Sequence, residues 1–139
     1  MTEHKLTFQD AEGLNVVGIL SNPTSSLEKP IIILAHGFSS SKESVTFTTL
    51  QNTLNKHKIS TFRFDFFGHG ESDGKFADVT ISKAINNLLH AITFLKEQGY
   101  TKIGLFGSSF GGISSIIAAS KTVIRIHKYG LSKSIPIVS

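Results

Sequence analysis

The chain of 139 residues contains no cysteine and no tryptophan, and it has only three prolines. Without cysteine it can form no disulfide, no thiolate nucleophile and no cysteine-ligated zinc site. Long hydrophobic runs are also missing, since the longest aliphatic stretch, residues 31–35, is far short of the roughly 20 residues that cross a bilayer. The first ten residues mix acids and bases without an apolar core, so no signal peptide is expected. These absences favour a cytoplasmic protein with no membrane association.

Acidic residues are missing from the end of the chain. Lys and Arg number 14 against 10 for Asp and Glu, which gives a net charge of +4. Acids and bases balance up to residue 120, whereas residues 121–139 contain four bases and no acid. The basic excess therefore belongs to a short tail and is not spread over one face, so nucleic-acid binding is not expected.

Apolar runs and turn residues predict a hairpin followed by alternating strands and helices. The hairpin comprises residues 5–10 and 14–20, joined by a turn that contains Gly13. Continuous apolar runs, which are typical of strands buried on both faces, then alternate with amphipathic segments. The strands are expected at 31–35, 60–65 and 102–106, and the helices at 44–57, 81–98 and 112–120. This order predicts an α/β fold, with a mostly parallel sheet and flanking helices.

The helices differ in how clearly the sequence marks them. In the first, Ser44 is a candidate cap, and Phe47, Leu50 and Leu54 are spaced to form the buried stripe. The second has a longer apolar stripe from residue 81 to 95, and Gly99 stands where the helix should end. After residue 120 the pattern decays: residues 123–126 could form another strand, and residues 134–139 are apolar but short.

Residues 107–111 match the pattern G-x-S-x-G. The pattern requires a sharp strand-to-helix turn with Ser109 at its apex, where only small residues such as Gly107 and Gly111 avoid collision. The start of the following helix offers unpaired N–H groups that can stabilise an oxyanion. The alternative is a glycine-rich turn whose serine caps the helix, or a phosphate-binding turn. The preceding apolar strand and following helix favour the nucleophile.

His36, Gly37 and Phe38 directly follow the strand at 31–35. The glycine lets the backbone turn so that the amide of Phe38 points inward. Together with the amide of Phe110, it would form an oxyanion hole with two donors. We interpret His36 as a structural residue, packed or hydrogen-bonded in the loop.

Three segments together resemble the α/β-hydrolase superfamily: IIILAHGF (31–38), RFDFFGHGESDG (63–74) and IGLFGSSFGG (103–112). The resemblance runs from about residue 5 to residue 120 and is closest to serine-aminopeptidase-like and feruloyl-esterase-like carboxylester hydrolases. It implies a nucleophile at Ser109 and oxyanion amides at Phe38 and Phe110. It also implies a structural turn after the second parallel strand, in which Asp65 and Ser72 anchor hydrogen bonds and His69 is part of the turn rather than a base.

The acid and the histidine of a catalytic triad are missing from this sequence. The superfamily order is Ser, then Asp or Glu, then His, but the last acid here is Glu97 and the only later histidine is His127. We therefore interpret residues 1–120 as the N-terminal portion of a truncated α/β-hydrolase domain, and residues 121–139 as a basic tail of uncertain structure. Such a truncation would leave the strand at 102–106 as an open sheet edge, to be covered by residues 123–126, a partner chain or self-association.

The sequence thus predicts a serine hydrolase family member that cleaves a small ester or amide through an acyl-enzyme at Ser109. As this chain alone it is expected to be inactive or dependent on a partner. The alternative is a non-catalytic interaction module that retains the hydrolase scaffold. Neither a metal nor an organic cofactor is implied. A dinucleotide-binding fold is disfavoured because no G-x-G-x-x-G follows the first parallel strand.

Overall fold

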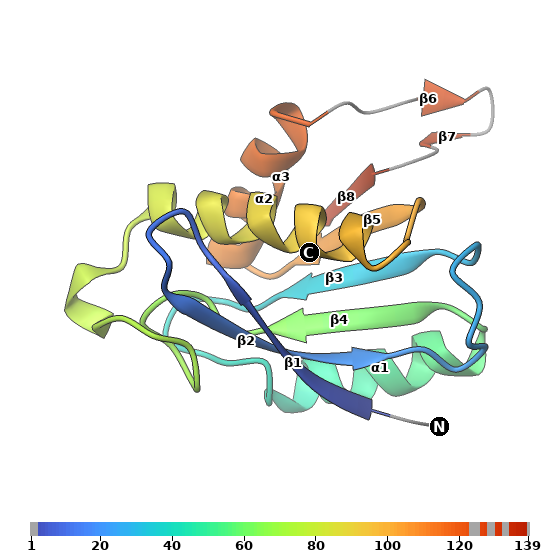
Figure 1. Ribbon diagram of the computed structural model, residues 1–139, viewed down its shortest axis with the longest axis horizontal. Coiled ribbons are helices and arrows are strands. Elements are labelled where there is room, and N and C mark those ends of the chain that lie inside the picture. The colour runs from blue at the N-terminus through green and yellow to red at the C-terminus, as the bar shows by residue number, and fades with distance from the viewer. Residues whose placement is uncertain (1–2, 123–125, 128–129, 132–133, 139) are drawn as a thin grey trace.

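The computed structural model describes residues 3–122, 126–127, 130–131 and 134–138, and it shows an α/β fold (Figure 1). A six-stranded sheet has the order β1-β2-β4-β3-β5-β8. Its strands are β1 (Glu3–Gln9), β2 (Asn15–Ser21), β3 (Ile31–Ala35), β4 (Ser60–Phe64), β5 (Ile103–Gly107) and β8 (Ser134–Val138). Strands β1 and β2 form an antiparallel hairpin, β2 joins β4 in antiparallel orientation, and the remaining pairs are parallel. The predicted fold class is confirmed.

Among the residues that the structure describes, three α-helices flank the sheet, and a short 3-10 helix lies in the loop after β4. They are α1 (Val45–Lys56), η1 (Phe76–Asp78), α2 (Ile81–Glu97) and α3 (Phe110–Ser120). Two short strands, β6 (Ile126–His127) and β7 (Gly130–Leu131), form a separate antiparallel pair. The Ser44 side chain accepts a hydrogen bond from the amide of Phe47 at the start of α1, and Gly99 has a φ of 105° just after α2. The start of α1 and the end of α2 therefore lie where Ser44 and Gly99 predict them.

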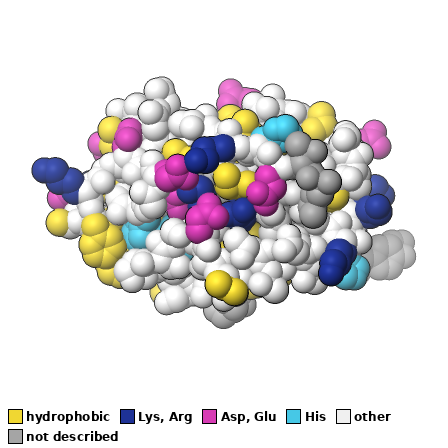
Figure 2. Space-filling view, turned by 90° about the horizontal axis from the view of Figure 1, so that it is seen from below, with side chains coloured by type: hydrophobic (Ala, Val, Ile, Leu, Met, Phe, Trp, Pro, Cys, Tyr) yellow, Lys and Arg dark blue, Asp and Glu magenta, His cyan; other side chains and the backbone are white. Residues whose placement is uncertain are grey.

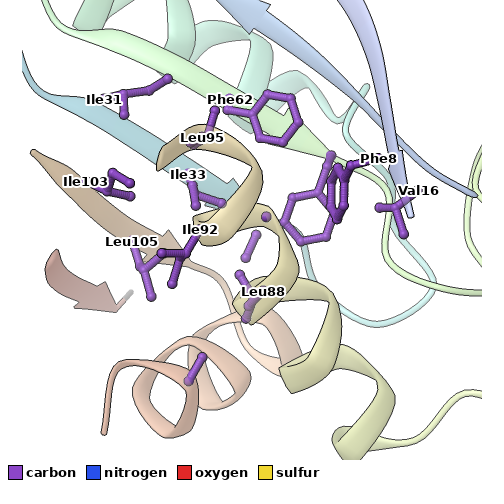
Figure 3. Close-up of a cluster of buried hydrophobic side chains, with 14 of the residues drawn as sticks. Phe8, Val16, Ile31, Ile33, Phe62, Leu88, Ile92, Leu95, Ile103 and Leu105 are labelled. Atoms are coloured by element: carbon purple, nitrogen blue, oxygen red, sulfur yellow. The ribbon is translucent and has the colours of Figure 1, made fainter. Parts of the chain in front are cut away.

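The hydrophobic core lies between the sheet and helices α2 and α3. Figure 3 shows α2 lying across the strands, with Leu88, Ile92 and Leu95 directed toward side chains of the sheet. Odd-numbered residues of β3 and even-numbered residues of β4 face this core, because successive side chains of a strand point to opposite faces. Phe62 and Phe64 extend the core with aromatic contacts to Phe8.

The opposite face of the sheet packs against α1, largely through polar side chains. The predicted buried stripe of Phe47, Leu50 and Leu54 is therefore only partly right. Phe47 is buried, but Gln51 and Asn55 take the inward positions, whereas Leu50 and Leu54 are only half-buried. Gln51 accepts a hydrogen bond of 2.7 Å from Nε of Arg63, and Asn55 accepts one of 2.6 Å from Ser21. The buried amides are tolerated because partners on the sheet satisfy them.

The edge of the sheet also differs from the prediction. Strand β8 pairs with β5 in parallel, from Ile103 opposite Ser134 to Gly107 opposite Val138, so β5 is not an open edge. The expected alternative, a strand over 123–126, lies mostly outside the described residues, and Ile126 belongs to β6. Pro136 within β8 suits an outer strand, since proline lacks the N–H that a central strand needs.

We predict that Leu88→Ala destabilises the fold by about 2–5 kcal/mol, because it leaves a cavity in a fully buried position. The measurement is the free energy of unfolding from urea denaturation. Val45→Ala, at a position 80% exposed on α1, is the control and should change the free energy by no more than about 0.5 kcal/mol. Equal effects of the two substitutions would contradict the core assignment.

Candidate active site

Ser109 lies at the apex of the turn that joins β5 to α3. Its backbone has φ 53° and ψ −115°, which is a strained conformation for a residue with a side chain. The side chain is exposed and makes no capping hydrogen bond to α3. The hydroxyl is therefore held out from the end of the strand and is not used to cap the helix.

The two glycines of the turn are needed because backbone lies against backbone here. A Cβ on Gly111 would collide with the carbonyl oxygens of Ala35 and His36. A Cβ on Gly107 would collide with the backbone of Gly111 and Gly112. The start of α3 is thus pressed against the end of β3, which brings the loop after β3 next to Ser109.

The loop that contains Phe38 borders the turn directly. A Cβ placed on Gly37 would lie 3.9 Å from Cβ of Ser109, and the rings of Phe38 and Phe110 are 5.6 Å apart. The amide of Ser40 donates to Gly37 and that of Gly111 donates to Ser108. In the described part of the chain, no acceptor is assigned to the amides of Phe38 or Phe110. Two backbone donors thus remain available in the turn and in the loop that borders it.

Aromatic side chains lie around the rings of Phe38 and Phe110. The Phe38 ring lies 4.8 Å from that of Phe76 and 5.9 Å from that of His69, while Phe110 lies 5.5 Å from Phe66. Phe38 and Phe76 are 52% and 46% exposed. They form an apolar surface beside Ser109, which we call the aromatic shelf.

His36 is buried at the end of β3, and both of its ring nitrogens are engaged. The amide of Phe66 donates to Nε2 at 3.1 Å, so Nδ1 must carry the proton, which it donates to the carbonyl of Gly37 at 2.7 Å. Burial lowers the pKa of His36 to about 4, and the nearby His69 and Lys42 add to the effect, against opposing contributions from Gly37 and Asp65. Neutral His36 therefore ties the loop after β3 to the loop after β4.

His69 is also committed to the backbone. The amide of Ser39 donates to its Nε2 at 3.0 Å, and its Nδ1 lies 2.9 Å from the carbonyl of Phe67. A histidine with both nitrogens engaged in this way cannot accept the proton of Ser109 without losing a hydrogen bond. His127 is part of β6, but its side chain is not among those that the structure describes.

Asp65 is fully buried and links the same two loops. Its Oδ1 accepts the amide of Lys42 at 2.8 Å, and its Oδ2 accepts the amide of Glu71 at 2.9 Å. The ammonium of Lys42 pairs with Oδ2 of Asp65 and with Glu71 at 2.8 Å. Burial alone would lower the pKa of Lys42, but the hydrogen bonds to the two carboxylates outweigh it and raise this pKa. Gly70 has no room for a Cβ, which would collide with the Asp65 carboxylate.

The ion pairs continue from Lys42 to the surface. Hydrogen bonds from Lys42 and Lys5 lower the pKa of Glu71 to about 2, and Arg63 pairs with Glu3 at 3.2 Å and Glu43 at 3.1 Å. Figure 2 shows acidic and basic side chains side by side on one face of the molecule. The sequence analysis did not identify Lys42, because its neighbours are small polar residues and nothing local indicates that its side chain is buried.

A small pocket of about 160 Å³ lies beside the turn. It is lined by His36, Gly37, Ser40, Ser44, Thr46, Phe47 and Ser108. Within the described ranges, no group of three or more His, Asp or Glu side chains is placed to hold a metal ion. In the same ranges, no helix is long and apolar enough to cross a membrane.

The sheet order, the strained serine turn and the adjacent loop define an α/β hydrolase. The chain belongs to the family described as serine aminopeptidase S33, whose model matches residues 27–131. It is 29% identical over 124 residues to an uncharacterized 31.7 kDa protein of Escherichia coli from the traX-finO intergenic region, covering 87% of this chain and 41% of that protein. It is 27% identical over 108 residues to an acyl transferase of Shewanella hanedai, covering 77% of this chain and 34% of that protein.

Solved structures agree with this assignment. The structure of Est1E from Butyrivibrio proteoclasticus with ferulic acid bound is 34% identical to this chain, with a TM-score of 0.78, and the match covers 84% of this chain and 47% of that one. The α/β hydrolase GrgF of Penicillium sp. sh18 is 26% identical with a TM-score of 0.79, covering 88% of this chain and 43% of that one. The chain thus spans less than half the length of these relatives and structures.

We predict that Asp65→Asn destabilises the protein by about 3–5 kcal/mol, because it leaves the buried ammonium of Lys42 without its main counter-charge. Thermal and urea unfolding would measure the loss. Asp78→Asn makes the same change of charge at an exposed position and should be nearly neutral. A stable Asp65→Asn protein would show that the ion pair does not anchor the loops.

We predict an acid destabilisation that depends on His36. Because its pKa is about 4 in the folded protein and about 6.5 when unfolded, the unfolded state binds more protons between these values. The contribution of His36 to the free energy of unfolding is therefore fully present above about pH 6.5. It falls by up to about 3 kcal/mol as the pH is lowered toward 4. Urea unfolding across this range should show a shallower decline in His36→Gln than in wild type, whereas His57→Gln should follow wild type.

Proposed function

We propose that this chain carries the nucleophile and the oxyanion hole of a serine hydrolase that cleaves an ester or amide. The observation that supports this most directly is Ser109, which is exposed at a strained turn, next to the amide of Phe110 and beside the loop that carries the amide of Phe38. The chain's membership of a hydrolase family and its similarity to the structure of Est1E are consistent with this role.

In the proposed reaction, Oγ of Ser109 attacks the carbonyl carbon of the substrate and loses its proton to a base. The carbonyl π electrons move to the oxygen, which accepts hydrogen bonds from the amides of Phe38 and Phe110. When the tetrahedral intermediate collapses, the bond to the leaving group breaks, and the protonated base returns the proton to that group. Water then hydrolyses the acyl-enzyme by the same route.

The base is not one of the described histidines next to Ser109. Both ring nitrogens of His36 and His69 are held by backbone groups, and no acid follows Glu97 that could orient a later histidine such as His127. Serine without a base is a poor nucleophile. We therefore propose that full activity requires a histidine and an acid from outside the described residues.

The aromatic shelf supports a substrate with an apolar acyl or leaving group. Phe38 and Phe76 are about half exposed, and the Phe38 ring contacts that of Phe110, which follows Ser109. Exposed rings next to a reacting centre favour flat or apolar groups. The structure of Est1E that resembles this chain holds ferulic acid, an aromatic acid.

A non-catalytic interaction module is the second candidate. It is favoured by the same hydrogen bonds that exclude His36 and His69 as bases. In that case the hydrolase scaffold would be retained for binding, and Ser109 would be dispensable.

We predict that the purified chain releases p-nitrophenol slowly from p-nitrophenyl acetate and that Ser109→Ala abolishes this release. A serine without a base to take its proton is a poor nucleophile, so only a weak rate that depends on Ser109 is expected. Ser120→Ala, at the far end of α3, should retain the wild-type rate. If wild type and both variants match buffer while remaining folded, the interaction module becomes the better interpretation.

A further inference from the structure

The backbone after Phe38 is held in an unfavourable conformation. Ser39 has a φ of 61°, in the left-handed region that residues with a side chain rarely adopt. Ser109, in the neighbouring turn, also has a positive φ, of 53°. One strained residue follows the amide of Phe38, and the other precedes the amide of Phe110. Such conformations persist only where neighbouring groups hold them.

His69 is the side chain that holds Ser39. Its Nε2 accepts the amide of Ser39 at 3.0 Å, while its Nδ1 lies 2.9 Å from the carbonyl of Phe67. The ring is buried and lies between the aromatic groups of the site, 5.9 Å from the ring of Phe38 and 6.4 Å from that of Phe110. Packing and the Nδ1 hydrogen bond therefore fix the direction of the Nε2 lone pair.

We propose that His69 is a positioning residue that acts as a neutral acceptor for the amide of Ser39 and thereby keeps the amide of Phe38 directed at the substrate oxygen. This inference rests on the proposed function. The Ser39 bond prevents the peptide between Phe38 and Ser39 from rotating back to an unstrained conformation. His69 thus takes part in the reaction through backbone geometry and not through proton transfer.

The protonation state of His69 is central to this role. A protonated imidazole carries a hydrogen on both nitrogens, so Nε2 would face the N–H of Ser39 as a second donor. The charged and titratable groups around it are His36, whose ring lies 4.8 Å away, and the Asp65–Lys42 pair beneath the same loop. Burial lowers the pKa of His36 to about 4.

The first test follows the amide signal of Ser39 by ¹H–¹⁵N NMR as the pH is lowered. In wild type, the signal should move with the same midpoint as the imidazole protons of His69. In His69→Gln, whose amide oxygen can still accept but does not titrate, that transition should disappear. A wild-type Ser39 signal that does not follow His69 would overturn the proposal.

The second test compares ester hydrolysis by folded variants. His69→Phe removes the acceptor but keeps an aromatic ring, and it should lower the Ser109-dependent rate by as much as the roughly 10²–10³-fold that one oxyanion donor contributes, with little change in KM. His69→Gln should restore much of this rate, and the exposed His57→Phe should match wild type. Equal rates for His69→Phe and wild type would overturn the proposal.

The two tests separate the inference from the proposed function. If Ser109→Ala hydrolyses as fast as wild type, the proposed function fails. The NMR titration still decides whether His69 holds the loop, because it requires no turnover.

Discussion

The carboxylate of Asp65 is the group on which the geometry of the site depends. It is buried, and a buried charge is tolerated only when it is paired and hydrogen-bonded. Its partners are the ammonium and amide of Lys42 and the amide of Glu71, which belong to the loops after β3 and β4. Satisfying this one charge therefore fixes two loops at the same end of the sheet. The clash that a side chain at Gly70 would cause shows how closely the second loop approaches the carboxylate.

These fixed loops hold the backbone groups of the candidate site in place. Gly111 lies against the carbonyl of Ala35, and the loop after β3 lies beside Ser109. His36 and His69 each accept a hydrogen bond from a backbone amide of the other loop. These two bonds join the loops in addition to the contacts of Asp65. The positive φ angles of Ser39 and Ser109 are sustainable in such surroundings, because strained conformations persist where neighbouring groups hold them.

The sequence predicted most of the fold because its signals are local. Continuous apolar runs marked β3 and β5, a long apolar stripe marked α2, and the spacing of glycines around Ser109 marked the turn. The inward face of α1 was mispredicted because Gln51 is buried by partners distant in sequence, Arg63 and Glu3. Lys42 and β8 were missed for the same reason: an ion pair across 23 residues and a strand pairing with β5 leave no periodic pattern.

The roles of the two neighbouring histidines show why the base must be sought elsewhere. A general base needs a free lone pair directed at the nucleophile, but both histidines use Nε2 to accept an amide, which requires the tautomer with the proton on Nδ1. In the proposed reaction, a histidine that took up the proton of Ser109 would release its loop at the moment when the oxyanion needs the amide of Phe38. Oxyanion stabilisation and proton transfer are therefore incompatible tasks for these residues. If the proposed mechanism holds, an active enzyme built on this scaffold requires a third histidine that is free of the two loops.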